Sequence, residues 1–253
     1  MTTVPASVAR PEGTVADTVR RLAGAQKGAQ GAPAYSRFVN RKLGRVLAAL
    51  AFHAGLTPNA VTGISAVCTF SGIAVLALVP PSWPMGLAVA VLLVLGYAFD
   101  SADGQLARLR GGGSAAGEWL DHMVDALKIA SLHLALLIGW YRSGLVEGEA
   151  WLLLPLGFSA VSVVLFFGTL LNESLRAQHG VRTRAAHTAG ERPSVLRSLL
   201  VAPTDYGLLC LVFLLLGAPL VFLWAYGLLF LATAGYLALA CVKWFGEMER
   251  LGR

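Results

Sequence analysis

The chain has 253 residues, of which 56% are hydrophobic and only 13% charged, and its mean hydropathy is +0.66. This composition excludes an ordinary soluble enzyme and indicates an integral membrane protein. The net charge of +6 is explained by membrane topology and contact with lipid, so we expect no nucleic-acid partner.

The first 33 residues are rich in Ala, Gly, Pro and Arg. We expect them to form a disordered cytosolic tail, and residues 34–253 to form the membrane domain. From Tyr35 to Ala54, apolar residues recur at helical spacing and basic residues occupy other faces. This pattern predicts an amphipathic helix that lies in the membrane interface, the alternative being a helix packed on the protein's own cytosolic surface.

Six apolar segments follow, which predicts an all-α membrane protein with six transmembrane helices. Thr57 is a predicted N-cap for the first segment, with Pro58 at the first helical position. Residues 111–114, Gly-Gly-Gly-Ser, are interpreted as an interhelix turn rather than a phosphate-binding loop, because no Lys-Ser/Thr follows them. The segments cover about 57–79, 85–100, 117–140, 150–171, 206–216 and 219–245, and the fifth is shorter than a bilayer core requires.

The distribution of Lys and Arg predicts the orientation of the chain. Only Arg142 falls in a predicted outer loop, and Lys128 lies within the third segment; the other basic residues are in the tail, the inner loops and the C-terminal region. By the positive-inside rule both termini face the cytosol. We expect a multi-pass protein of the plasma membrane.

Four carboxylates interrupt the second and third apolar segments. Asp100 and Asp103 are three residues apart, and Asp121 and Asp125 are four apart, so each pair lies on one face of its helix. An Asp at the centre of a membrane helix costs roughly 2.5–3.5 kcal/mol. Such a cluster needs cations, and its hard oxygen ligands favour Mg²⁺, Mn²⁺ or Ca²⁺ over zinc.

Between Asp100 and Asp125 the sequence reads D-x-x-D-G-x-x-A-R, eight residues, then G-x-x-x-D-x-x-x-D. This pattern matches the signature of the CDP-alcohol phosphotransferase family at every fixed position. The chain also resembles that family in its six-span layout, its interfacial helix and the Thr-Pro-Asn-x-x-Thr sequence at residues 57–62. The resemblance covers about residues 35–245.

The resemblance implies transfer of a substituted phosphoryl group from a CDP-linked donor to an alcohol, with release of CMP, by a homodimeric enzyme. We expect CDP-diacylglycerol as the donor, because helices that are open to lipid suit a two-tailed molecule. The family pattern implies two Mg²⁺ (or Mn²⁺) ions with Asp100, Asp103 and Asp121 as ligands. It implies that Asp125 is the general base and also contacts an ion.

The resemblance further implies a donor-binding role for residues from three predicted helices. Gly104 and Gly117 have no side chain and Ala107 has a small one, which lets a nucleotide approach the backbone. Arg108 offers several donors to phosphate oxygens. Helix packing for the glycines and a topological role for Arg108 are the alternatives. The donor-binding set is Asp100, Asp103, Gly104, Ala107, Arg108, Gly117, Asp121, Asn59 and Thr62.

The acceptor side has no comparable signature. Lys128 could hold an anionic acceptor or pair with Asp125 on the same helix face. Arg182 and Arg184 could bind the phosphate of a sugar or polyol phosphate, or they could reflect topology alone. Asp205 is interpreted as a helix cap or an Arg partner rather than a fifth metal ligand.

Two other functions fit parts of the pattern. One is a transferase that uses a water-soluble CDP-alcohol donor. The other is a divalent-cation transporter, since carboxylates within the membrane also mark ion pathways. Against the transporter, the aspartates lie at one membrane face, with no acidic residues at matching positions in the other half of the spans.

Overall fold

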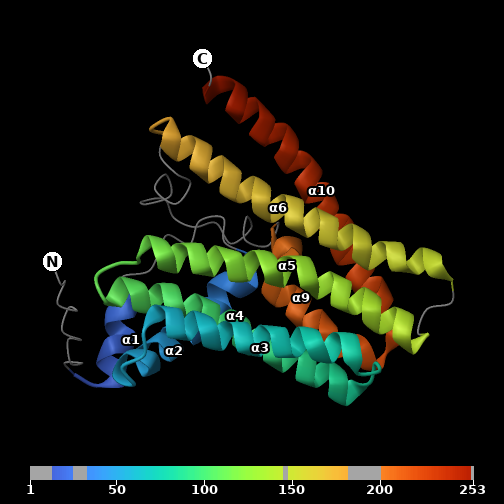
Figure 1. Cartoon of the computed structure of the whole chain (residues 1–253), viewed down its shortest axis with the longest axis horizontal. Helices are drawn as coiled ribbons and strands as arrows, with labels where there is room; N and C mark the ends of the chain where they lie inside the picture. Colours follow the sequence, from blue (N-terminus) through green and yellow to red (C-terminus); the bar gives the residue numbers. More distant parts are fainter. Residues whose placement is uncertain (1–12, 25–32, 145–147, 182–200, 252–253) are drawn as a thin grey trace.

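The computed structural model describes residues 13–24, 33–144, 148–181 and 201–251 (Figure 1). Every regular element within these ranges is a helix, so the all-α fold class is confirmed. Among the described residues, five helices are long and apolar enough to cross a membrane. They are α3 (Pro58–Leu78), α4 (Trp83–Leu109), α5 (Ala115–Ser143), α6 (Leu153–Gln178), which the 3₁₀ helix η2 (Glu149–Leu152) precedes, and α10 (Pro219–Leu251).

The predicted fifth span is much shorter than these helices. Helix α9 (Tyr206–Val212) has seven residues and continues into the 3₁₀ helix η4 (Phe213–Gly217), which has five. Together they extend roughly 20 Å, against the roughly 30 Å of a hydrocarbon core. The short helix η3 (Ala202–Thr204) precedes them. By length and composition, five of the described helices can therefore span a membrane, and a count of six depends on this short apolar segment.

Part of the predicted disordered tail is a helix, α1 (Val15–Gly24). The Asp17 carboxylate accepts a hydrogen bond from the Thr14 N–H at 2.9 Å, and Thr14 Oγ1 accepts one from the Asp17 N–H at 3.2 Å, which forms a capping box. Leu22 is buried, and the Thr18 hydroxyl lies 3.1 Å from His53 Nε2. The prediction of disorder does not hold for residues 15–24, because docking on the next helix stabilises a segment too short to be helical alone.

The predicted amphipathic helix is present as the π-helix η1 (Ser36–Asn40) followed by α2 (Arg41–His53). Its inner face is made of small residues, and a Cβ at Gly44 would lie 2.6 Å from Ser101 Oγ on α4. Only glycine permits so close an approach. The opposite face exposes an apolar row typical of a helix in the membrane interface: Phe38, Val39, Leu43, Val46 and Leu50.

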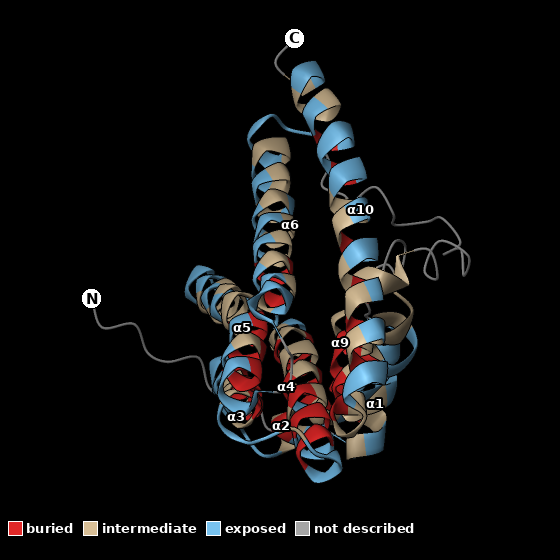
Figure 2. Cartoon of the chain, turned by 90° about the vertical axis from the view of Figure 1, so that its right-hand side faces the viewer, coloured by how far each residue is buried: buried red, intermediate tan, exposed pale blue. Residues whose placement is uncertain are grey.

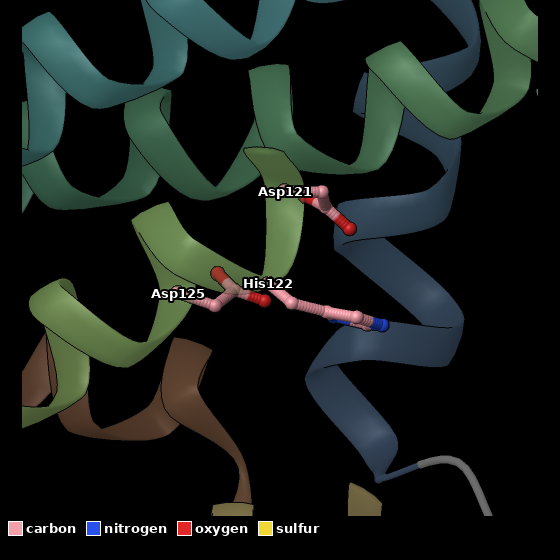
Figure 3. Close-up of side chains that lie close together, drawn as sticks. All are labelled: Asp121, His122 and Asp125. Carbon is pink, nitrogen blue, oxygen red and sulfur yellow. The ribbon is translucent and has the colours of Figure 1, made fainter. Parts of the chain in front are cut away.

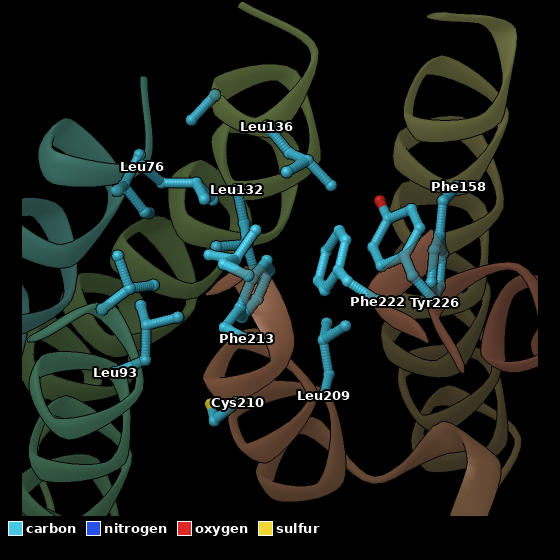
Figure 4. Close-up of a cluster of buried hydrophobic side chains, with 14 of the residues drawn as sticks. Leu76, Leu93, Leu132, Leu136, Phe158, Leu209, Cys210, Phe213, Phe222 and Tyr226 are labelled. Atoms are coloured by element: carbon cyan, nitrogen blue, oxygen red, sulfur yellow. The ribbon is translucent and has the colours of Figure 1, made fainter. Parts of the chain in front are cut away.

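The spanning helices differ in how much of each is buried. In their apolar stretches, 39–44% of the residues are buried for α3, α4 and α5, against 17% for α6 and α10. Figure 2 shows α6 and α10 extending away from the others with mostly exposed surfaces. Where the two groups meet, the apolar core draws side chains from several elements (Figure 4), among them Leu76, Leu93, Leu132, Phe213 and Phe222.

Candidate active site

The turn between α4 and α5 places the two halves of the aspartate motif near each other. Gly111 and Gly112 have φ of +96° and +132°, a region that disfavours other residues. The Ser114 side chain then caps α5 by accepting a hydrogen bond from the Gly117 N–H at 3.1 Å. The neighbouring helix α3 packs against both α4 and α5. The turn prediction for residues 111–114 is confirmed.

A lysine joins the two halves of the motif. Lys128 Nζ lies 3.2 Å from Asp100 Oδ1 on α4 and 2.5 Å from Asp125 Oδ1 on α5. The lysine is 5% exposed, and a charge that is so buried needs close counter-charges. The ammonium also lies 5.2 Å from the centre of the Tyr206 ring. Of the two interpretations of Lys128, the structure shows the carboxylate pairing, and contact with an acceptor stays a prediction.

Asp103 is held in place by two hydrogen bonds. The Thr62 hydroxyl on α3 donates to Asp103 Oδ2 at 2.6 Å, and the Gly104 N–H donates to Oδ1 at 2.5 Å. Both Asp103 and Thr62 are buried. Thr62, predicted to contact the donor, therefore contacts an aspartate of the motif, and its side chain fixes the direction in which that carboxylate points.

The remaining aspartates lie on one turn of α5, beside a histidine that the sequence analysis did not select. Ligand atoms of Asp121, His122 and Asp125 all lie within 4.8 Å of one another (Figure 3). The charges of Asp103, Asp121 and Asp125 all act on the Asp100 carboxylate, so the four aspartates form one electrostatic cluster. Carboxylate oxygens at this density suit Mg²⁺ or Mn²⁺, so the residues present fit a divalent ion.

The other predicted donor-binding residues surround this cluster. A Cβ on Gly117 would lie 3.1 Å from Asn59 Oδ1, whereas one on Gly104 would meet only Arg108 Nη1 at 3.6 Å. Ala107 lies in the last turn of α4, where its carbonyl accepts a hydrogen bond from Gly112. Arg108 is exposed, in the field of Asp103 and Arg41. Arg182 and Arg184 lie outside the described residues.

Asp205 is a helix cap, as the sequence predicts. Its Oδ1 accepts a hydrogen bond from the Gly207 N–H at 3.1 Å, at the start of α9, and its Oδ2 accepts one from the Ser36 N–H at 3.0 Å. Burial raises the pKa of this carboxyl, and these backbone hydrogen bonds oppose the rise. The residue thus ties α9 to the amphipathic helix.

A cavity of about 240 Å³ lies between α5, α6, α9 and α10. Its lining is mainly apolar and contains none of the four motif aspartates, but it includes Tyr206, whose ring faces Lys128. The buried His133 is one of its polar lining residues. The His133 Nδ1 atom lies 2.7 Å from Tyr226 Oη, and its Nε2 atom lies 3.2 Å from Ser162 Oγ. One aromatic side chain therefore separates an apolar cavity from the charged cluster.

Comparison with known proteins adds a family match. Residues 55–242 match the family described as CDP-alcohol phosphatidyltransferase. Among solved structures, one similar chain is the phosphatidylinositol phosphate synthase PgsA1 of Mycobacterium tuberculosis, in complex with manganese and citrate. The two sequences are 21% identical, and the match covers 79% of this chain and 87% of that chain with a TM-score of 0.48. A likeness at that level does not bear on the chemistry of this chain. Among curated protein sequences, none matches.

Proposed function

Because the chain belongs to the CDP-alcohol phosphatidyltransferase family, we propose that it transfers the phosphatidyl group of CDP-diacylglycerol to an alcohol. Family membership makes the protein a CDP-alcohol phosphotransferase of phospholipid synthesis, and no observation favours the cation transporter. In the reaction, the acceptor oxygen bonds to the phosphatidyl phosphorus, the bond from that phosphorus to CMP breaks, and the acceptor's hydroxyl proton passes to a base.

The four aspartates are assigned to metal binding. Their convergence supports this role, because four carboxylates close to one another in a membrane protein repel unless cations lie among them, and Lys128 pairs with only two of them, Asp100 and Asp125. Divalent ions, two for a cluster of this charge, would neutralise the donor diphosphate and the charge of the departing CMP. Mg²⁺ and Mn²⁺ both fit oxygen ligands.

Asp125 is assigned as the base, and its contact with Lys128 is the observation that carries the proposal. The 2.5 Å pairing fixes Asp125 Oδ1 and leaves the other carboxylate oxygen to accept the acceptor's proton. Because Lys128 also pairs with Asp100, the proposed base is held at a set position relative to a proposed metal ligand. Thr62 does the same for Asp103.

A lipid donor is supported by the surroundings of the cluster. The apolar cavity beside Tyr206 can take part of an acyl chain, and the exposed apolar row on α5, including Trp119, Met123 and Leu127, meets lipid beside the aspartates. With a water-soluble CDP-alcohol as donor, these surfaces would instead hold a lipid acceptor. CDP-diacylglycerol is proposed as the donor because they lie beside the aspartates, where the diphosphate of the donor would bind.

The proposal also covers the residues that bind the acceptor, the membrane orientation of the enzyme and its oligomeric state. Lys128, Arg182 and Arg184 would bind an anionic alcohol such as a sugar or polyol phosphate. The distribution of basic residues supports a site at the cytosolic face of the plasma membrane with both termini in the cytosol. A homodimer is expected from the family resemblance alone.

The test is an assay of the purified chain in lipid nanodiscs with CDP-diacylglycerol and a panel of alcohols and alcohol phosphates. We expect CMP release that requires Mg²⁺ or Mn²⁺, stops with EDTA and needs one acceptor, whose phosphatidyl product mass spectrometry identifies. CDP-ethanolamine, with diacylglycerol as acceptor, is the matched soluble donor. CMP release from that donor alone would contradict the phosphatidyl donor, and release from neither would contradict the proposed function.

A further inference from the structure

His122 lies inside the aspartate cluster, at a position that the motif leaves free. One of its ring nitrogens and the carboxylate oxygens of Asp121 and Asp125 lie within 4.8 Å of one another (Figure 3). At bond lengths of about 2.0–2.3 Å, two donor atoms on opposite sides of a divalent ion are roughly 4–4.6 Å apart and neighbouring ones roughly 3 Å apart. Side-chain rotations that draw the three donor atoms together by roughly 1–2 Å would therefore bring all three onto one ion.

The two ring nitrogens of His122 have different surroundings. Nδ1 is buried and has no hydrogen-bond partner, whereas Nε2 lies 3.9 Å from a carboxylate oxygen of Glu118, one turn earlier in α5. A buried nitrogen without a partner is costly, and a metal-binding histidine usually directs its other ring nitrogen to a carboxylate or carbonyl. The side chain as a whole is 40% exposed, which leaves room for the ring to turn Nδ1 toward an ion.

We propose that His122 binds, through Nδ1, a divalent ion that Asp121 and Asp125 also hold. This inference rests on the proposed function, because it adds one ligand to the same metal site. Mg²⁺ prefers oxygen ligands and dehydrates reluctantly, whereas an imidazole nitrogen favours first-row transition-metal ions. This chain should therefore prefer Mn²⁺ to Mg²⁺ more strongly than a site of carboxylates alone.

The test uses the full chain in phosphatidylcholine nanodiscs with Mn²⁺ as the probe. Electron spin-echo envelope modulation of the bound Mn²⁺ should show coupling to an imidazole nitrogen, and the coupling should be lost in His122→Ala. Mn²⁺ affinity should fall by at least about tenfold in that variant, since losing even an outer-shell partner costs about 10- to 100-fold. Mg²⁺ affinity, measured by competition, should fall less. Met123→Ala, at the exposed neighbouring position, is the matched control and should keep both the coupling and the affinity.

Absence of imidazole coupling in the wild-type protein would overturn the inference without any variant. Coupling that persists in His122→Ala, or in His122→Gln if the alanine variant does not fold, would also overturn it. In both cases Mn²⁺-dependent CMP release would leave the proposed function standing. No bound Mn²⁺ and no CMP release would overturn both.

Discussion

The helices within the two halves of this molecule are packed against one another to different degrees. In the motif half, formed by α2 to α5, helices approach so closely that a Cβ at Gly96 would lie 2.1 Å from Thr69 Oγ1. In the lipid-exposed half, formed by α6 and α10, 17% of each apolar stretch is buried. The two helices come close where a Cβ at Gly168 would lie 2.7 Å from Trp244, but a Cβ at Gly235 would meet nothing within 4 Å. Transfer chemistry needs carboxylates at fixed positions, whereas a surface that admits a lipid needs few internal contacts.

The polar contacts follow the same division. In the motif half, Thr62 and Lys128 hold three of the four aspartates. In the lipid-exposed half, Arg176 pairs with Glu247, which joins α6 to α10 near their C-terminal ends. The first set orders the aspartates of the motif, and the second joins two helices. Under the proposed function, the donor and its metal ions bind in the motif half, which also holds Lys128, one of the proposed acceptor contacts.

The largest effect should come from the proposed metal ligands. Asp100→Asn or Asp121→Asn should weaken Mg²⁺ and CDP-diacylglycerol binding together and lower turnover by at least about 10²–10³-fold, the range for removing one electrostatic stabiliser of a transition state. Isothermal titration and CMP release would measure the two effects. Glu247→Gln, a carboxylate change in the lipid-exposed half, is the control and should keep donor binding. Unchanged Mg²⁺ binding in both Asp variants would contradict the assignment.

The next largest effect should be on stability, where a Gly→Ala substitution should have different consequences in the two halves. Gly96→Ala should destabilise the protein by about 1–3 kcal/mol, because the new methyl group overpacks the contact with Thr69. Gly235→Ala should be neutral or should stabilise by about 0.5–1 kcal/mol, because alanine favours an exposed helix. The thermal unfolding midpoint in detergent would report both. Equal shifts would mean that these two positions do not differ in packing.

Loss of a positioning contact should have a smaller effect. Thr62→Val removes the hydrogen bond to Asp103 while keeping the size of the side chain, and should weaken donor binding by about tenfold, or roughly 1.4 kcal/mol. Thr18→Val removes a comparable buried hydroxyl on α1, which lies 3.1 Å from His53 Nε2 and lines neither the aspartate cluster nor the cavity. It should leave donor affinity unchanged. Equal losses in the two variants would show that the Asp103 contact has no special role.

The smallest effect should be on the acceptor alone. If Arg182 or Arg184 binds an anionic acceptor, Arg→Ala should raise the acceptor KM by about three- to tenfold with the donor KM nearly unchanged, because only a binding contact is lost. Steady-state kinetics with each substrate varied in turn would measure this. Effects of equal size on both substrates, or none, would return these arginines to a topological role.

The sequence predicted best the features that depend on local spacing. The pairing of aspartates on two helices, the Thr57 cap and the amphipathic helix all follow from short-range periodicity, and Thr57 does accept a hydrogen bond from the Ala60 N–H at 3.2 Å. Helix α1 was missed because its stability depends on contacts with α2 such as the Thr18 to His53 pair, which lie far apart in the sequence.

The site itself was only partly predictable. Lys128 lies three residues after Asp125, so pairing between them was one of two expectations, but its contact with Asp100 depends on how α4 and α5 are arranged around α3. His122 stands at a free position of the motif, next to one aspartate and three residues before another. That helical spacing could have indicated that His122 lies near both aspartates, but a motif defined by its fixed positions draws no attention to the residues between them.

The central claim is that the aspartate cluster binds the metal and donor while Asp125 takes the acceptor's proton. Measuring donor binding and single-turnover CMP release on Asp125→Asn tests it most directly. The change keeps size and hydrogen-bonding capacity, so donor affinity should stay within roughly tenfold while turnover falls by about 10²–10⁴, the range for losing general acid–base assistance. Turnover above about a tenth of the wild-type rate, when chemistry limits the rate, would contradict the assignment of Asp125 as the base.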